Sequence, residues 1–540
     1  MAPAFRPLAA VLLLVSPALA PAADPLHARV DAHVAKGFGE HKKHAGPASD
    51  DEFLRRAYLD LVGTVPTVQQ VNEFLADSSK DKRAKLIDAL LASPGYARRM
   101  AWFFDVTLME RGKDAKVPRA AWEAYLSATF AANKPYDEFV RELLSNDGSD
   151  PKTRPAAKFF LDRDLEPHIV TKDIARVFLG RNLQCAQCHD HPTIDDYKQA
   201  EYYGIQAFLN RTFLFPNAGA PTAVIAEKAE GDVSFMSVFD KNKKLNSTAP
   251  KIANAKAIEE PKAEKGKEYK VAPAKDVRPI PAYSRFAQLA SAVTAPENKY
   301  FARNAVNRVW AMLMGRGLVH PVDTDHGNNP ASHPELLDEL TREFVAHKYD
   351  LKWLVREIAL SDAYQRSSIV PAGLDEVPAD RYLVAVVKPL TAEQLAYAAM
   401  QATGHTDTER VAMGAKGSES MLDIRLAGRL GPFRAMFGRG ADQTADDFSA
   451  TLDQTLFVKF GSPVRGLLPP RAGNLADRLG KLTNPDAVAD ELFASVYARR
   501  PTAQERQDVA DALKGAKDRQ TAINELIWAL LASAEFRFNH

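Results

Sequence analysis

Residues 53–61, FLRRAYLDL, place apolar side chains three and four positions apart, which is the spacing of one face of an α-helix. The same spacing returns in residues 86–91, 139–144 and 351–360. No run of alternating apolar and polar residues, the pattern typical of a strand, appears before residue 212. The sequence therefore predicts a mainly α fold.

The helical pattern is interrupted in the middle of the chain. Residues 251–280 are rich in Lys, Glu, Ala and Pro, a composition that buries too little apolar surface to offset the entropy of ordering. Ahead of this charged linker, Val233–Phe239 is the best candidate for a short strand. We therefore expect two helical domains, residues 23–215 and 281–540, joined by an irregular, partly disordered insert, residues 216–280, with little β structure.

Threonine residues mark the expected starts of three helices. In each case a Gln or Glu follows three positions later, so that the two side chains can satisfy each other's free backbone N–H groups in a capping box. Ser332–Glu335 has the same spacing and carries a proline, Pro334, early in the expected helix. The three threonine pairs are Thr67 with Gln70, Thr391 with Gln394, and Thr502 with Glu505.

The first 22 residues have the features of a signal peptide. Arg6 precedes an apolar stretch, residues 7–20, and Ala20-Pro21-Ala22 supplies the small side chains that a signal peptidase reads. The stretch is shorter than the ~20 residues that span a bilayer. We expect a periplasmic or secreted mature protein with no integral membrane segment; the alternative is an uncleaved N-terminal anchor.

Charge and composition exclude several classes of protein. Lys and Arg number 70 and Asp and Glu 69, so the formal net charge is +1 and gives no support to a nucleic-acid partner. Apolar residues at 46% and charged residues at 26% exclude wholesale disorder and a membrane-spanning bundle.

The two cysteines of the chain, Cys185 and Cys188, are followed directly by His189. In one helical turn these three side chains share a face. The C-x-x-C-H pattern is the attachment sequence of haem c, in which both thiols bond to the porphyrin and the histidine ligates the iron. The pattern predicts Cys185 and Cys188 as covalent anchors and His189 as the axial ligand. In bacteria this attachment takes place outside the cytoplasm, in agreement with the signal peptide.

Three other interpretations of the motif stay open. An exported C-x-x-C can form a disulfide or act as a dithiol, although the βαβ pattern of thioredoxin-like proteins is absent. The two cysteines with His189 or His191 could bind zinc, but a closed site needs four ligands and no second pair is visible. The motif could also be a structural relic without a cofactor.

Longer stretches around the motif resemble a known family. Residues 176–204 contain RVFLG, QCAQCHDHP and YYG and are similar to domain of unknown function 1549, a planctomycete-type cytochrome-c-like domain. Residues 298–310 and 329–337 resemble its usual companion, domain of unknown function 1553. The resemblance implies a secreted, mainly helical protein suspected of electron transfer, with no established reaction. Thr193 stands where the family commonly has Phe, and the three haem residues are unaffected by this departure.

The sixth iron position has several candidate ligands. Their identity matters because methionine raises the reduction potential relative to a second histidine. His191 is a weak candidate, because on a helix it would point about 200° away from His189. Each remaining candidate also has a structural explanation, such as a turn or a helix start. They are His168, His320, His333, Met312 and Met314, with His326 as a further histidine.

The remaining polar features are less specific. Asp323–Asn329 has enough oxygen ligands for calcium or a carbohydrate-like substrate, but Asp and Asn also favour plain turns. No phosphate loop, G-x-S-x-G or H-E-x-x-H motif is present, so the sequence leans away from a familiar enzyme. The sequence leaves two functions. The first is an exported c-type haem protein that passes electrons to an unknown redox partner. The alternative is a non-haem helical scaffold or extracellular polymer-binding protein with a local Cys185–Cys188 disulfide.

Overall fold

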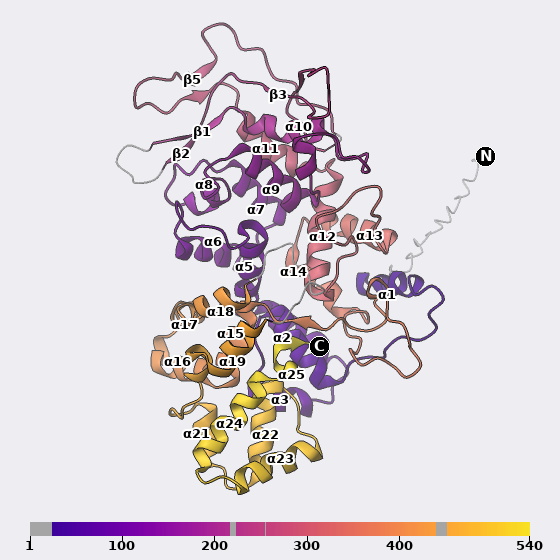
Figure 1. The fold of residues 1–540 in the computed structure, drawn as a ribbon, viewed down its shortest axis with the longest axis vertical. Coiled ribbons are helices and arrows are strands. Elements are labelled where there is room, and N and C mark those ends of the chain that lie inside the picture. Colours follow the sequence, from indigo (N-terminus) through magenta and orange to yellow (C-terminus); the bar gives the residue numbers. More distant parts are fainter. Residues whose placement is uncertain (1–23, 217–222, 254, 439–450) are drawn as a thin grey trace, which may run out of the picture.

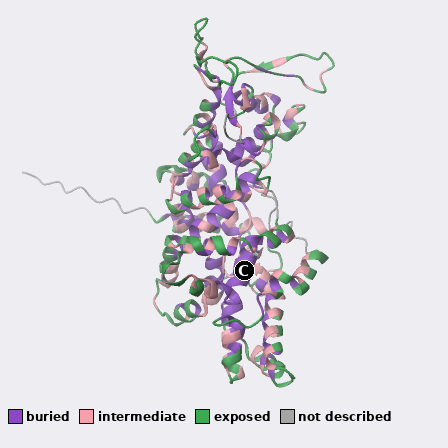
Figure 2. Cartoon of the chain, turned by 90° about the vertical axis from the view of Figure 1, so that its left-hand side faces the viewer, coloured by how far each residue is buried: buried purple, intermediate pink, exposed green. Residues whose placement is uncertain are grey.

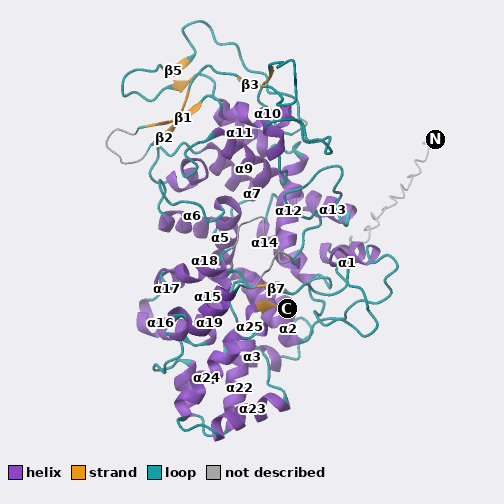
Figure 3. Ribbon diagram, viewed as in Figure 1, coloured by secondary structure: helices purple, strands orange, loops and turns teal. Residues whose placement is uncertain are grey.

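The computed structural model describes residues 24–216, 223–253, 255–438 and 451–540. Helices make up most of this part of the chain, and the strands form two-stranded antiparallel sheets (Figures 1 and 3). The expected mainly α fold with little β structure is confirmed. The signal peptide expected at residues 1–22 lies outside the described ranges, within which no helix has the length and apolar character to cross a bilayer.

Helices α1 to α10 precede the insert. Several begin at a polar cap: α2 starts after Ser49, whose hydroxyl accepts from the N–H of Glu52. The bounds are α1 Leu26–Lys36, α2 Asp50–Leu61, α3 Val68–Ala76, α4 Lys82–Ala92, α5 Pro94–Met109, α6 Arg119–Ala131, α7 Tyr136–Ser145, η1 Arg154–Ala157, α8 Lys158–Leu161, α9 Pro167–Leu179, η2 Gln184–Gln187 and α10 Gln199–Leu209.

Four helices after the insert pack back onto the first ten. α12 contacts α9, and α14 contacts α1 and α4. An example is the ring of Phe301 on α12, which stacks on that of Tyr136 on α7 with centroids 5.2 Å apart. These helices are α11 Arg285–Val293, α12 Lys299–Met314, α13 Pro334–Ala346 and α14 Leu351–Leu360.

The remaining helices form the lower part of Figure 1. The C-terminal strand β8 (Phe538–Asn539) returns to pair antiparallel with β7 (Lys388–Pro389). The bounds are η3 Ala379–Arg381, α15 Ala392–Ala402, α16 His405–Met413, η4 Gly414–Lys416, α17 Glu419–Ala427, α18 Leu430–Phe437, α19 Leu452–Phe460, α20 Ser462–Arg465, α21 Leu475–Lys481, α22 Pro485–Tyr497, α23 Ala503–Lys514, α24 Arg519–Ala532 and α25 Ala534–Arg537.

Buried apolar side chains form two clusters. Figure 2 colours the buried residues purple and shows them along the inside of the helical body. The first cluster draws mainly on residues 26–382, from both sides of the insert. The second draws on residues 390–536 and adds Leu59, Val65 and Trp102 from the N-terminal helices. This division of the core near residue 385 was not expected from the sequence. The domain boundaries at residues 215 and 281 stay predictions.

The insert lies at one end of the molecule and has three small sheets (Figure 3). Its loops carry exposed apolar side chains, among them Val238 and Phe239. The expected strand at Val233–Phe239 is present in its first three residues. The strands are β1 Thr212–Phe215 with β2 Val224–Glu227, β3 Val233–Phe235 with β4 Asn246–Thr248, and β5 Tyr269–Val271 with β6 Ile280–Pro281.

The capping boxes expected at Thr67, Thr391 and Thr502 are confirmed, with both hydrogen bonds present in each. The box expected at Ser332–Glu335 is wrong. α13 does begin at the expected proline, but His333 is the capping position, without a side-chain cap. The reason is burial: the ring of His333 lies directly against Gly37, where a Cβ would meet its Nε2 at 1.8 Å.

Candidate functional site

The C-x-x-C-H motif lies on the loop between α9 and α10. α9 ends at Gly180, which has a left-handed φ of 65° and packs so closely on α12 that a Cβ would meet Asn304 Oδ1 at 2.7 Å. Beyond this turn the chain forms the 3-10 helix η2, where the N–H of Cys188 donates to the carbonyl of Cys185 at 3.2 Å. The expected helical turn is therefore present in its tighter, 3-10 form.

The turn is fixed through its backbone while the sulfur atoms stay accessible. Cys185 and Cys188 are both exposed, and neither is in a disulfide. The hydroxyl of Tyr203 donates to the carbonyl of Gln187 at 2.9 Å. On the other side, the N–H of Val238 donates to the carbonyl of Cys188 at 3.0 Å. α10 and the insert thus hold the motif between them.

The imidazole of His189 has one nitrogen committed to the backbone. Its Nδ1 lies 2.7 Å from the carbonyl oxygen of Asp190, and since a carbonyl only accepts, Nδ1 carries the proton. Nε2 then has the free lone pair in the neutral ring. It makes no hydrogen bond to any residue in the described ranges. The geometry leaves Nε2 available as a ligand atom.

Apolar side chains of the insert lie beside the motif. The ring of Phe239 contacts that of His189, with centroids 4.7 Å apart, yet Phe239 remains 73% exposed. Val238 is 65% exposed and Met236 45%. A cluster of large exposed apolar residues indicates a contact surface. We call Met236, Val238 and Phe239 the apolar flap.

His191, two residues after His189, has a structural role. Its Nδ1 accepts from the N–H groups of Thr193 at 3.2 Å and Ile194 at 3.1 Å, which closes the following turn. Its ring packs edge-on against Tyr197. This nitrogen is therefore occupied by the backbone, in contrast to Nε2 of His189.

The polar loop Asp323–Asn329 contacts the residues that follow the motif, Thr193 to Tyr197. The N–H of Gly327 donates to Asp196 Oδ2 at 2.8 Å, and the amide of Asn328 to the carbonyl of Thr193 at 2.6 Å. The ring of His326 packs edge-on against Tyr197, and burial lowers its pKa. These hydrogen bonds hold the segment after the C-x-x-C-H motif against the chain that follows α12.

Carboxylates of the polar loop are already paired with arginines. Asp323 bonds Arg176 and Arg308, and Asp325 accepts from Arg303 Nε at 2.9 Å. Within the described ranges no group of three or more His, Cys, Asp or Glu has the arrangement of a metal site. The turn-forming interpretation of this loop is the one its contacts fit.

The five candidates for the sixth ligand lie in different places. His168, at the start of α9, contacts Tyr202 on α10, with Nδ1 3.1 Å from the hydroxyl oxygen. The ring of Tyr202 packs edge-on against that of Tyr203, whose hydroxyl donates to Gln187, so two tyrosines link His168 to the motif. The other four lie elsewhere: His320 and Met312 line a cavity between the two cores, Met314 is buried near Tyr382, and His333 is buried under α1.

Sequence reasoning missed the apolar flap and Tyr203 as neighbours of the motif. The flap lies about 50 residues downstream and contacts the motif through a backbone hydrogen bond from Val238 and the ring of Phe239, and no spacing rule predicts these contacts. Tyr203 stood within the YYG stretch already noted, and its stack on Phe235, 4.5 Å between centroids, explains why an aromatic residue is needed there.

Comparison with known proteins gives two matches. Residues 29–213 match the family model described as PSCyt2, a protein of unknown function (DUF1549), and residues 285–421 match PSD1, a protein of unknown function (DUF1553). These matches support the two domain names expected from the sequence. No curated protein and no solved structure matches the chain.

Proposed function

We propose that this protein is an exported c-type haem protein that transfers electrons, in line with the cytochrome-c-like interpretation of its first domain. The observation that carries the proposal is the state of His189. Nδ1 donates to the Asp190 carbonyl, which fixes the tautomer and orients Nε2 as a ligand. Two accessible thiols stand one and four residues before it.

The residues present fit haem c. Cys185 and Cys188 would each form a thioether with one vinyl group of the porphyrin, and His189 Nε2 would ligate the iron. The apolar flap offers the exposed side chains against which a porphyrin face or edge could pack. When bound, the haem supplies a one-electron redox couple; the protein positions it and tunes its potential through the axial ligands and burial.

His168 is favoured as the sixth ligand. Its contact residue, Tyr202, packs against Tyr203, which donates to Gln187 within the motif. Its Nδ1 is engaged with the Tyr202 hydroxyl, which leaves Nε2 for iron. The proposal therefore favours bis-histidine ligation, which gives a lower potential than methionine does.

Optical absorption tests the proposal directly. The full chain, produced with the c-type haem maturation machinery, should show reducible Soret and α bands that survive acid-acetone extraction. His189→Ala should keep the covalent haem, shift the bands and acquire a new spectrum on addition of imidazole. His191→Ala is the matched control, because its Nδ1 closes a turn and it should leave the spectrum unchanged.

Two outcomes would reject the proposal. If no haem is retained and alkylation finds no free thiol, the protein is the disulfide-bonded scaffold or polymer-binding protein instead. If haem is retained but His189→Ala has the wild-type spectrum, another residue ligates the iron. Export is tested by the N-terminal sequence of the mature protein, which should begin after Ala22.

A further inference from the structure

A cavity of about 230 Å³ lies between the two apolar cores, where α5, α12 and the start of α15 converge. Its wall also includes Asp60 at the end of α2, the strand β7 and Asn539 of β8. None of the residues of the C-x-x-C-H loop lines it. The cavity is therefore a site separate from the proposed haem site, and a ligand could bind in it whether or not the loop carries haem.

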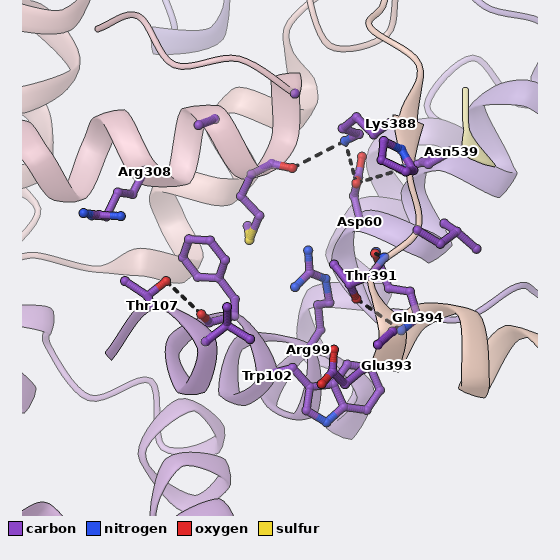
Figure 4. A pocket seen from close by; sticks show the side chains of 18 of the residues that line it. Asp60, Arg99, Trp102, Thr107, Arg308, Lys388, Thr391, Glu393, Gln394 and Asn539 are labelled. Carbon is purple, nitrogen blue, oxygen red and sulfur yellow. Dashed lines mark hydrogen bonds and ion pairs between the residues drawn. The ribbon is translucent and has the colours of Figure 1, made fainter. Parts of the chain in front are cut away.

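Arg99 of α5 is the unusual residue of this cavity. It is only 6% exposed, and its guanidinium makes no direct hydrogen bond or salt bridge within the described ranges, although the charges of Asp60 and Glu393 act on it from a distance. Figure 4 shows its guanidinium pointing into the space bounded by Thr107, Arg308, Lys388 and Thr391. A guanidinium cannot lose its charge at neutral pH, so Arg99 is a buried cation with no direct hydrogen-bonded partner in the described chain, which is costly in proteins.

The two acidic groups in the wall are already occupied. Asp60 accepts from Lys388 Nζ at 2.7 Å and from Asn539 Nδ2 at 2.8 Å. Glu393 accepts from both terminal nitrogens of Arg111, at 2.8 and 3.0 Å. Five basic side chains line the cavity against these two acids. Arg308 pairs in turn with Asp323 outside the wall, so Arg99 is left as the buried cation of the wall without a direct salt bridge in the described chain.

The rest of the wall is largely apolar and points to an organic ligand. Its large apolar side chains include Trp102, Phe103, Met312, Leu390 and Phe437. A cavity of about 150 Å³ holds a benzene ring, so about 230 Å³ has room for a ring and one carboxylate. A highly charged inorganic anion would lose its hydration against these side chains without compensation.

We propose that this cavity binds a small organic monocarboxylate with an apolar, ring-sized body, and that Arg99 receives the carboxylate. A planar guanidinium can donate two parallel hydrogen bonds to a carboxylate, which is the pairing that Arg99 lacks within the described chain. The first turn of α15, from Ala392 onward, borders the same space, and the N-terminus of a helix favours an anion. The ligand's body lies among the apolar side chains of α5 and α12.

Calorimetric titration of the full chain with benzoate tests the site. Benzoate should bind saturably, raise the midpoint of thermal unfolding, and bind at least about tenfold more tightly than benzyl alcohol, which lacks the carboxylate. Sodium sulfate should not compete. Arg99→Met should weaken benzoate binding about 30-fold, equivalent to ~2 kcal/mol, the usual contribution of a charge-assisted hydrogen bond.

Control variants separate the site from general effects. Arg342, on α13, also has no partner among the residues that the structure describes, but it is exposed, so Arg342→Met should bind benzoate like the wild type. Ala311→Phe fills the cavity from α12 and should abolish binding while Arg99 stays in place. Removing an unpaired buried charge should not destabilise the fold, which circular dichroism of Arg99→Met checks.

Three results would overturn the proposal: no binding of benzoate to the wild type, equal affinity in Arg99→Met, or equal competition by sulfate. In the last case the cavity would be a site for inorganic anions, and the apolar wall would have no part in recognition.

Discussion

The C-x-x-C-H loop and the Arg99 cavity differ in how the chain builds them. Five consecutive residues supply the loop's chemistry, and its thiols lie at the surface. The cavity takes its polar groups from residues as far apart as Asp60 and Asn539, and it buries several of them, including these two. Because the loop's thiols are exposed, replacing them should not disturb packing. Each acidic side chain of the cavity wall forms an ion pair with a basic one, so replacing it leaves a charge without its counter-ion. This difference predicts opposite responses to substitution.

The largest expected effect is at the loop and concerns the cofactor alone. Cys185→Ser combined with Cys188→Ser should abolish covalent haem completely, because the chain contains no other thiol. Haem staining after denaturing electrophoresis measures this. The free energy of unfolding of the haem-free protein should change by less than about 0.5 kcal/mol, since both side chains are exposed.

A double variant that still retains haem after denaturation would remove the basis for covalent attachment. A large loss of stability in the haem-free double variant would contradict the difference between the two sites, because the loop would then be as important for packing as the cavity wall.

At the cavity wall the expected effect is on stability. Asp60→Ala removes the carboxylate that pairs with Lys388, and Asn539 also loses its acceptor. Removing one partner of a buried ion pair costs about 3–5 kcal/mol, because the other charge stays buried. Chemical denaturation measures the loss. Adding Lys388→Met to Asp60→Ala should recover part of it; a double variant no more stable than Asp60→Ala would show that Lys388 is not the source of the cost.

The sequence predicts the features that depend on nearby residues, such as the C-x-x-C-H loop, and misses those that depend on distant residues, such as the Arg99 cavity. The helices, three capping boxes and the short strand at Val233 depend on neighbours within a few residues, and spacing alone predicts them. The cap at Ser332 failed because tertiary burial of His333 against Gly37 overrode a local rule. Arg98 and Arg99 are adjacent in sequence, yet one pairs with Asp423 and the other is buried without a direct salt bridge in the described ranges. Only the packing of α5 distinguishes them.

Acid should weaken the cavity wall at Glu393. Burial alone would raise the pKa of Glu393, but hydrogen bonds and charge from Arg111 and Arg434 lower it to about 2. Its pKa in the unfolded chain is near 4.5, so the unfolded state binds the proton more readily. Glu393 therefore contributes about 3 kcal/mol of stability above pH 4.5, which is lost as the pH falls toward 2.

Denaturant titrations between pH 6 and pH 3 measure this dependence. Glu393→Gln should be less stable at pH 6 and should show a shallower decline in acid than the wild type. Parallel pH profiles for the two proteins would mean that Glu393 does not control the acid response of the wall.

The smallest expected effect compares two helix caps of the same design. Thr391 and Thr67 each accept from the N–H three residues ahead, at 3.3 and 3.2 Å, so replacement by Ala should cost about 1 kcal/mol at either position. The difference lies in their surroundings: Thr391 borders the Arg99 cavity, and Thr67 does not. Loss of the Thr391 cap frays the first turn of α15, which the proposed carboxylate approaches. Thr391→Ala should therefore weaken benzoate binding severalfold, and Thr67→Ala should leave it unchanged at equal loss of stability.

Equal benzoate affinities in the two variants would show that the start of α15 takes no part in binding the anion, and recognition would then rest on Arg99 alone.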